Sequence, residues 1–279
     1  RDCLESLRES APRHSQELIV VDNASADGSA EMVQEEFPGV HLIRNRANLG
    51  FTRANNQGIR VSKGRYVLLL NNDTRVVPGA FSEAIEYLDR ETTIGAAGLR
   101  LLNEDGSLQL SCRRFPSFSQ ALFNRYSLLT RLFPGNKFSR AYLMTDIEHG
   151  QIRDVDWVSG ACLFIRRGAL NTVGLLDERF FMYSEDVDFC FRVWQHGWRV
   201  TYLPFAEVYH LIGGSSRLAR RMTIIERHRS MIRFYKKHYS RHLMFLDFVT
   251  SAMVSLRCAT QLVTNTARAG MRKIAGERL

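Results

Sequence analysis

RYVLLLNNDT, residues 65–74, is a short apolar run that stops on three polar residues. Residues 66–70 have the length and continuous apolar character of a buried central strand. Ligands of open α/β sheets bind outside the carboxyl ends of the strands, which is where Asn71, Asn72 and Asp73 fall. Asp73 is suited to a divalent cation, and the two amides can hydrogen-bond a sugar or a phosphate. On this stretch alone, an Asx turn that merely ends the strand is the alternative.

Strand and helix signals alternate along the first 100 residues. The expected strands are residues 17–22, 40–44, 66–70 and 94–99, and the expected helices are residues 26–37, 52–62 and 81–88. This alternation is typical of an α/β domain with a mostly parallel sheet covered on both faces. Because residues 1–9 look like the end of an amphipathic helix, we expect a first strand to be missing from this chain.

The second half of the domain is less regular. Residues 103–150 break the alternation, and we expect a flap or short helices over a cleft there. A strand is predicted over 156–166 (DWVSGACLFIR), where Gly160 indicates close approach of a ligand or a backbone. Residues 185–194 (EDVDFCFRVW) have helical periodicity, with acidic residues in the first turn, where the helix dipole favours anions. The last expected strands are residues 199–203 and 207–210.

The net charge of +9 belongs to the C-terminal part of the chain. Residues 217–242 carry nine Lys or Arg against one Glu, whereas residues 1–216 are nearly balanced. Apolar side chains recur at helical spacing over 217–239, which predicts a basic amphipathic helix that favours an anionic partner. We therefore expect a domain over 1–212 and a basic helical extension over 213–279.

Residues 245–263 continue with an apolar stripe that Asp247 and Arg257 interrupt. Such a helix suits a membrane interface better than a membrane span. Packing of these helices on their own domain is the alternative. The five cysteines form no CxxC pair and residues 1–13 are polar, which indicates reduced thiols, no signal peptide and a cytosolic location.

Three elements present carboxylates at their ends. Asp22 follows one expected strand, Asp73 follows another, and Glu185 and Asp186 begin a helix. Transfer from a sugar nucleotide needs one acid for the nucleoside, one for a metal ion and one for the acceptor proton. A phosphatase or a nucleotidyltransferase could use the same set, so spacing alone leaves these classes open.

Five motifs together resemble glycosyltransferase family 2, and most of all its rhamnosyltransferase-like branch in bacterial cell-surface polysaccharide synthesis. The resemblance covers roughly residues 1–240 in the family's order. The motifs are VVDNASADGS at 20–29, NLGF at 48–51, LLLNNDT at 68–74, DWVSGACLFIRR at 156–167 and DERFFMYSEDVDFCFRVWQHGWRV at 177–200.

The resemblance implies a GT-A fold, a nucleotide-binding αβα sandwich joined to an acceptor-binding half. Asp186 matches the catalytic base, with Glu185 as its nearest rival. Asp73 and His210 match the ligands of a divalent cation, Mg²⁺ or Mn²⁺, although Asn71 departs from a strict acidic start of the metal motif. The implied donor-binding residues are Asp22, Asn23, Asn48, Asn71, Asn72, Trp157 and Gly160.

The implied reaction is inverting transfer of a sugar, L-rhamnose from dTDP-L-rhamnose, to a lipid-linked saccharide. We expect the enzyme to be peripheral on an anionic membrane surface at the inner face of the plasma membrane, with no nucleic-acid partner. Galactofuranose, glucose and N-acetylglucosamine are alternative donor sugars. A non-enzymatic module that binds nucleic acid or membrane through the basic segment is the alternative from another class.

Overall fold

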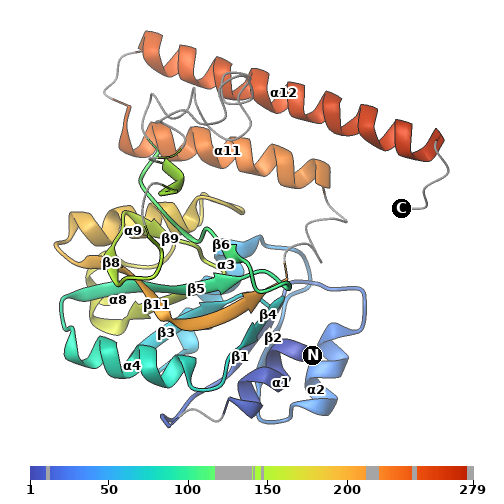
Figure 1. Cartoon of the computed structure of the whole chain (residues 1–279). Coiled ribbons are helices and arrows are strands. Elements are labelled where there is room, and N and C mark those ends of the chain that lie inside the picture. The colour runs from blue at the N-terminus through green and yellow to red at the C-terminus, as the bar shows by residue number, and fades with distance from the viewer. Residues whose placement is uncertain are drawn as a thin grey trace. The chain divides into compact units, whose positions relative to one another are not determined.

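The computed structural model describes residues 1–10, 13–116, 140, 142–145, 148–211, 220–240 and 244–274. The chain divides into two compact units (Figure 1). Unit 1 comprises Arg1–Glu178 and Glu185–Gly213, and unit 2 comprises Arg179–Ser184 and Gly214–Leu279. Most of the flap expected over 103–150 lies outside the described residues.

The first half of unit 1 alternates strands and helices, as the sequence predicts. Its elements are α1 (Asp2–Glu9), β1 (Ile19–Asp22), α2 (Ser29–Glu36), β2 (His41–Arg44), α3 (Phe51–Val61), β3 (Tyr66–Leu70), β4 (Thr74–Val76), α4 (Ala80–Arg90) and β5 (Ile94–Leu102). The second half continues with β6 (Leu108–Gln109), β7 (Cys112–Arg113), β8 (Arg153–Asp154), β9 (Trp157–Val158), β10 (Cys162–Arg166), α8 (Arg167–Val173), α9 (Glu185–Gln195) and β11 (Arg199–His210).

The main sheet is mixed, so the prediction of a mostly parallel sheet is wrong. Seven strands form it, with the order β3-β10-β5-β11-β4 and with β6 and β8 added on β5 and β11. β10 runs antiparallel to both β3 and β5, β4 runs antiparallel to β11, and β5 and β11 are parallel. β1 and β2 form a separate parallel pair. A continuous apolar run reports burial on both faces of a strand, and burial does not fix its direction.

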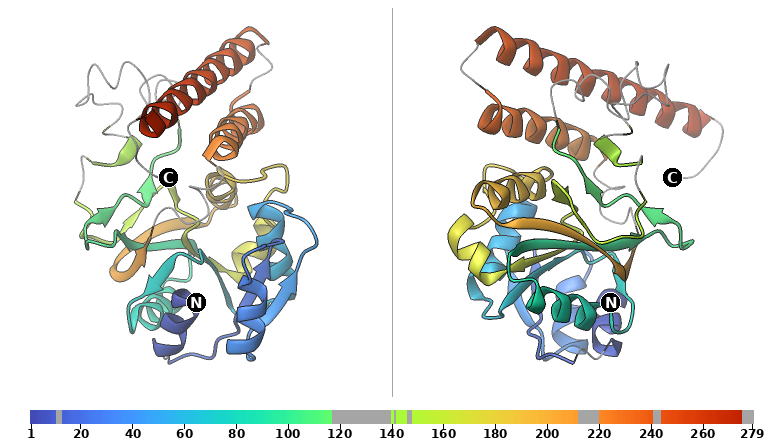
Figure 2. Two further views of the ribbon diagram at one scale, coloured as in Figure 1. Left: turned by 90° about the vertical axis from the view of Figure 1, so that its right-hand side faces the viewer. Right: turned by 60° about the vertical axis from the view of Figure 1, so that its left-hand side comes forward.

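Helices cover both faces of the main sheet (Figure 2). In α4 the side chains of Phe81, Ala84 and Leu88 are spaced three and four residues apart, so they form one apolar stripe. This stripe and the buried side of α1 pack on the sheet in one core cluster, where Phe81 meets Phe164 edge to face. α8 and α9 contact β5 and β10 or β11 from the other face. The sheet edges at the strand ends are left for polar residues.

The strand expected over 156–166 is broken into two. Trp157–Val158 pair with β7, Cys162–Arg166 join the main sheet, and residues 159–161 turn between them. Gly98 on β5 permits the end of β9 to approach closely, because a Cβ there would lie 2.5 Å from the Cβ of Val158. The two strands expected at 199–203 and 207–210 are one strand, β11, with a register shift between Leu203 and Glu207.

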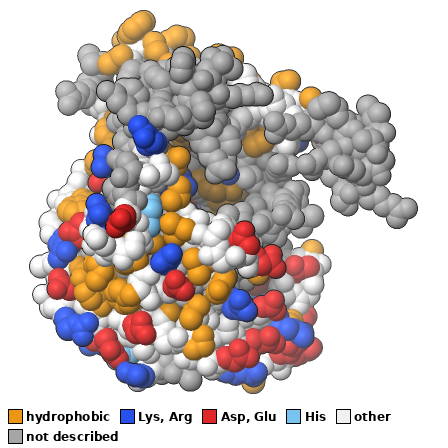
Figure 3. Space-filling model, in the orientation of Figure 1, with side chains coloured by type: hydrophobic (Ala, Val, Ile, Leu, Met, Phe, Trp, Pro, Cys, Tyr) orange, Lys and Arg blue, Asp and Glu red, His pale blue; other side chains and the backbone are white. Residues whose placement is uncertain are grey.

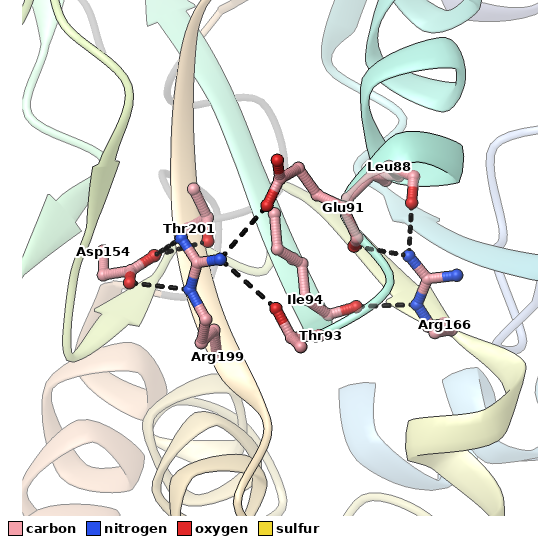
Figure 4. Close-up of polar contacts among 8 residues, drawn as sticks. All are labelled: Leu88, Glu91, Thr93, Ile94, Asp154, Arg166, Arg199 and Thr201. Carbon is pink, nitrogen blue, oxygen red and sulfur yellow. Dashed lines mark hydrogen bonds and ion pairs between the residues drawn. The ribbon is translucent and has the colours of Figure 1, made fainter.

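Two arginines occupy the edge of the sheet where β5 and β11 begin (Figure 4). Arg166 donates hydrogen bonds to the backbone carbonyls of Leu88 and Glu91 at the end of α4 and of Ile94 at the start of β5. Arg199 donates to the carboxylates of Asp154 and Glu91. The bonds from Arg166 to Leu88 and Glu91 satisfy carbonyls that the end of α4 leaves without a partner in the helix.

Unit 2 contains α11 (Arg220–His238) and α12 (Met244–Ile274). The basic helix expected over 217–239 is observed from residue 220 onward, and residues 217–219 lie outside the described part. The two helices are joined by a hydrogen bond of 2.6 Å from Ser240 Oγ to Asp247 Oδ2. None of the described helices has the length and apolar character that a bilayer-spanning segment needs.

Candidate active site

The turn that follows β3 is tied to the end of β11. Thr74 Oγ1 donates a 2.7 Å hydrogen bond to the carbonyl of Asn71, and Leu211 N donates a 2.7 Å bond to the carbonyl of Asp73. His210 pairs with Thr74 in the sheet. Residues that are more than 130 positions apart in the chain therefore meet at the carboxyl ends of β3 and β11.

The side chains of Asp73, His210 and Asn71 converge at this point. His210 Nε2 lies 3.2 Å from Asp73 Oδ1 and 3.3 Å from Asn71 Nδ2. Asp73 Oδ1 is buried and accepts no hydrogen bond from the described residues. A buried carboxylate oxygen without a donor is costly, because it has given up water without a replacement.

This arrangement fits a divalent cation. The other ring nitrogen of His210, Nδ1, lies 2.7 Å from Gln109 Oε1, so Nε2 is the nitrogen that faces Asp73. Carboxylate oxygen is a common ligand of Mg²⁺ and Mn²⁺, and the neutral imidazole nitrogen is a common metal ligand in general. Within the described part of the chain, no third His, Cys, Asp or Glu completes a cluster that could hold a metal ion. A cation bound with few protein ligands takes its remaining ligands from water and substrate phosphates.

Asp186 is fixed at the start of α9 by two backbone amides. Gly160 N donates a 3.0 Å hydrogen bond to Asp186 Oδ2, and Val187 N donates a 2.8 Å bond to Oδ1. A Cβ on Gly160 would lie 3.5 Å from the Cβ of Asp186, which is an ordinary van der Waals distance, so the contact with Asp186 does not by itself require glycine here. The group that meets Gly160 in the structure is the carboxylate of Asp186, at 3.0 Å from the backbone nitrogen, and the close approach of a ligand that the sequence indicates stays a prediction.

A short path of contacts links Asp186 to Asp73. Asn71 N donates a 2.9 Å hydrogen bond to the carbonyl of Ala161, next to Gly160. The side-chain amide nitrogen of Asn71 contacts His210 Nε2, and His210 Nε2 in turn contacts Asp73 Oδ1. The turn between β9 and β10 therefore brings the predicted base and the predicted metal ligands to one edge of the sheet.

Burial raises the pKa of both acidic residues at the start of α9. For Glu185, which is buried, the pKa is well above its ordinary value, and the charge of Asp186 adds to this effect. For Asp186 burial also raises the pKa, while the amides of Gly160 and Val187 oppose the shift. A carboxylate with a raised pKa is the better proton acceptor near neutral pH.

Tyr183 and Ser184 precede α9 with φ of 70° and 64°, a strained conformation for residues other than glycine.

Asp22, Asn23 and Asn48 form a second cluster, at the carboxyl end of β1. Asp22 is buried and accepts a 3.3 Å hydrogen bond from Ser25 N. Asn23 Oδ1 accepts from Leu49 N at 2.9 Å, and its Nδ2 donates to Asn48 Oδ1 at 3.0 Å. The two asparagines thereby fasten the loop before α3 to the end of β1. Their amides hold the shape of the loop, and Asp22 is the carboxylate of this cluster.

Asn72 and Trp157 differ in exposure. Asn72 is exposed in the turn after β3. Trp157 is buried, and its indole N–H donates a 2.9 Å hydrogen bond to the carbonyl of Arg114.

The Arg113 guanidinium lies 5.3 Å from the Trp157 ring, and its charge lowers the pKa of Asp186 against the effect of burial. Sequence reasoning missed Arg113, because nothing in the pattern around it separates it from the other arginines.

Solved glycosyltransferases share this fold. The mannosyltransferase PcManGT from Pyrobaculum calidifontis, solved with GDP-Man and Mn²⁺, superposes with a TM-score of 0.55 at 16% identity, over 95% of this chain and 75% of that one. GalNAc-T7, solved with UDP, GalNAc and Mn²⁺, gives a TM-score of 0.54 at 15% identity, over 75% of this chain and 40% of that one. The α/β unit is thus one that resembles GT-A glycosyltransferases.

The family model described as "Glycosyl transferase family 2" matches residues 1–152, more than half of the chain. The chain belongs to glycosyl transferase family 2. It is 34% identical over 204 residues to the N-acetylglucosaminyl-diphospho-decaprenol L-rhamnosyltransferase of Mycobacterium tuberculosis, covering 69% of this chain and 66% of that protein. It is 29% identical over 180 residues to the low-salt glycan biosynthesis hexosyltransferase Agl10 of Haloferax volcanii, covering 63% and 52%. The chain thus spans less than two thirds of the length of these curated relatives.

Proposed function

We propose that this chain carries out inverting transfer of L-rhamnose from dTDP-L-rhamnose to a lipid-linked saccharide in cell-surface polysaccharide synthesis. The observation that carries the proposal is the contact path from Asp73 through His210 and Asn71 to the turn that holds Asp186. The name of the mycobacterial relative supports both the sugar and the lipid-linked acceptor. The family match favours an enzyme over a non-enzymatic nucleic-acid or membrane module.

In the proposed reaction Asp186 is the general base. Its two oxygens are oriented by the amides of Gly160 and Val187, and burial raises its pKa towards the working pH. As the acceptor hydroxyl attacks the anomeric carbon, its proton passes to Asp186. The bond between the anomeric carbon and the diphosphate breaks on the opposite face, so the configuration inverts. A positioned base of this kind contributes about 10²–10⁴-fold to a rate.

Among the remaining predicted residues, Asp22, Asn71 and Asn72 bind the donor in this scheme, and the others support the site. Asp22 contacts the nucleoside, and Asn71 and Asn72 offer amides to the sugar or the phosphates. A divalent cation held by Asp73 and His210 would neutralise charge that develops on the leaving diphosphate. Gly160 leaves room beside the base, and Trp157 supports the neighbouring strand. Asn23 and Asn48 act by holding the loop before α3.

A panel of sugar nucleotides tests the donor. With Mn²⁺ present, dTDP-L-rhamnose at 100 times its Kd should stabilise the protein by about 2.7 kcal/mol, because a ligand that binds only the folded state shifts the unfolding equilibrium. UDP-galactofuranose, UDP-glucose and UDP-N-acetylglucosamine at equal concentration should stabilise it less. Thermal unfolding measures the shift, and product formation on a polyprenyl-diphospho-sugar confirms turnover. A larger shift with another donor would reassign the sugar.

We also propose that unit 2 attaches the enzyme to an anionic membrane at the inner face of the plasma membrane. The observation behind this is an exposed apolar face on α12. Phe245 is 75% exposed, Phe248 71%, and Leu256 and Val263 each 68%, and their spacing places them on one side of the helix. At the top of the view in Figure 3, hydrophobic side chains gather over the start of α12. Exposed apolar side chains in such a row are typical of an interaction surface.

Charge favours a lipid surface as the occupant of this face. Between residues 244 and 267 the charged residues are Asp247 and Arg257, and both contact the α11 side through Ser240 and Met231. The apolar face is thus uncharged along its described length. The exposed basic side chains of α11 are Arg221, Arg229, Arg233 and Lys236. A basic surface next to an uncharged apolar one complements anionic headgroups and acyl chains, and each basic residue near such a surface contributes about 1 kcal/mol.

The double variant Phe245→Asp/Phe248→Asp should weaken binding to vesicles of phosphatidylglycerol and phosphatidylethanolamine at least about tenfold, because two charges would enter the apolar layer. Sedimentation with vesicles measures this, and Ile152→Asp, at an exposed apolar residue of unit 1, is the matched control. Unchanged vesicle affinity of the double variant would contradict the assignment, as would association of the wild type through this face into dimers that ignore lipid.

A further inference from the structure

Gln109, the last residue of β6, contacts His210 with both ends of its side-chain amide. Gln109 Oε1 lies 2.7 Å from His210 Nδ1, and Gln109 Nε2 lies 3.1 Å from the backbone carbonyl oxygen of His210. The same Nε2 lies 2.9 Å from Asn103 Oδ1. One side chain therefore holds both the backbone and the ring of a proposed metal ligand.

The backbone carbonyl determines which way this amide points. A carbonyl oxygen only accepts hydrogen bonds, so the group facing it must be the NH₂ of Gln109. Gln109 Oε1 then faces His210 Nδ1, and since this oxygen also only accepts, Nδ1 must carry the hydrogen. In the neutral imidazole the other nitrogen, Nε2, is left with a lone pair.

The freed nitrogen is the one that faces the site. Around Nε2 stand Asn71 Nδ2 at 3.3 Å, which can donate, and Asp73 Oδ1 at 3.2 Å, which cannot. A nitrogen lone pair and a carboxylate oxygen without a hydrogen-bond donor repel each other electrostatically when they are adjacent. A cation that both atoms coordinate removes this repulsion. Because Gln109 orients the ring, His210 Nε2 and Asp73 Oδ1 together offer two lone pairs that can coordinate a divalent ion.

Gln109 is itself held by a tight turn. Asn103 N and the carbonyl of Ser107 are joined by a 2.8 Å hydrogen bond, and Asn103 Nδ2 donates to Ser107 Oγ at 2.9 Å. Gly106 completes the turn with φ of 79°, a conformation that favours glycine. The acceptor Asn103 Oδ1 is therefore fixed before Gln109 meets it, which gives Gln109 little freedom to rotate its amide.

We propose that Gln109 is a positioning residue that holds His210 in the Nδ1–H form, with Nε2 directed at the cation site. This inference rests on the proposed role of His210 as a metal ligand. Residues that orient a metal-bound histidine in this way typically contribute 10–100-fold to metal affinity. Gln109 has no contact with substrate in this scheme and acts through His210 alone.

The first test is made on the metal-free protein. In a long-range ¹H–¹⁵N spectrum of the side chains, wild-type His210 should show hydrogen on Nδ1. Gln109→Met, of similar size but without a hydrogen-bonding amide, should lose that single form and show a mixture. An unchanged His210 spectrum in Gln109→Met, in a protein that unfolds as cooperatively as the wild type, would overturn the proposal.

The second test measures Mn²⁺ affinity by electron paramagnetic resonance with dTDP present. Gln109→Met should bind Mn²⁺ about 10–100-fold more weakly, whereas Gln195→Met, at an exposed glutamine of α9, should bind like the wild type. Equal affinity in Gln109→Met and wild type would overturn the proposal. Failure of the wild type itself to bind Mn²⁺ would instead remove the metal role from the proposed function, and the spectrum of His210 would still decide whether Gln109 sets its tautomer.

Discussion

Replacing Asp186 with Asn should lower kcat for sugar transfer by about 10²–10⁴-fold and leave the donor affinity unchanged within about twofold. An amide has nearly the shape of a carboxylate and can still accept one of the two backbone hydrogen bonds, from Gly160 N or from Val187 N. It cannot take up the acceptor proton, so the loss should fall on the chemical step. Steady-state kinetics, together with calorimetric titration of the donor, separate the two effects.

The comparison variant is Glu185→Gln. Burial and the charge of Asp186 raise the pKa of Glu185, which favours its neutral form over the carboxylate that a base requires, so replacing it with an amide should cost less than tenfold in kcat. In the wild type, activity should fall as pH decreases through the raised pKa of Asp186, at a higher pH than for an ordinary aspartate. Near-normal turnover of Asp186→Asn, or a greater loss in Glu185→Gln, would move the base to another residue.

The positions of individual strand ends could be predicted from the sequence because they are local features. An apolar run of strand length that stops on Asn71, Asn72 and Asp73 fixes both the strand and the polar turn behind it. The first turn of α9 was recognisable for the same reason, since helical periodicity and clustered acids occur within ten residues. Local order of this kind does not depend on what the rest of the chain does.

The direction and the order of the strands could not be predicted in this way. β10 lies antiparallel between β3 and β5 after a connection of some 60 residues, part of which falls outside the described residues. Its sequence, CLFIR, would look the same in either direction, since both of its faces are buried. The break at Gly160 was also hidden, because a glycine within an apolar run indicates a close contact without saying that the strand ends there.

Residues that act through a neighbour were the hardest to recognise. Gln109 sits 101 positions before His210 and belongs to a two-residue strand, so no periodic pattern distinguishes it. Arg113 carries no signal beyond its charge, although it lies over Trp157 and influences Asp186. Donor binding by Asn23 and Asn48 stays a prediction, and the structure adds that their amides bond to each other and to the loop before α3. Roles of this kind follow from side-chain contacts, which appear only once the fold is known.

Replacing Asp73 with Ala should lower kcat/KM by about 10³-fold and abolish the response of the remaining activity to Mn²⁺. This loss corresponds to about 4 kcal/mol of transition-state stabilisation, within the range expected when charge on a leaving group is no longer neutralised by a cation. The variant removes the buried oxygen that has no hydrogen-bond donor, so the folded state should lose little stability or gain some. Thermal unfolding measured beside the kinetics separates a lost ligand from a damaged fold.

Asp89→Ala is the matched control, because Asp89 is a carboxylate of α4 that bonds Arg65 and Tyr66 at the start of β3, at the opposite end of the strand from Asp73. It should keep the Mn²⁺ dependence of the wild type. His210→Ala should resemble Asp73→Ala in its metal response, since both side chains meet at the same point. If added Mn²⁺ still activates Asp73→Ala, and half of the maximal activity is reached at the same Mn²⁺ concentration as in the wild type, the cation binds elsewhere. The contact between Asp73 and His210 then stabilises the end of β11 and has no role in binding metal.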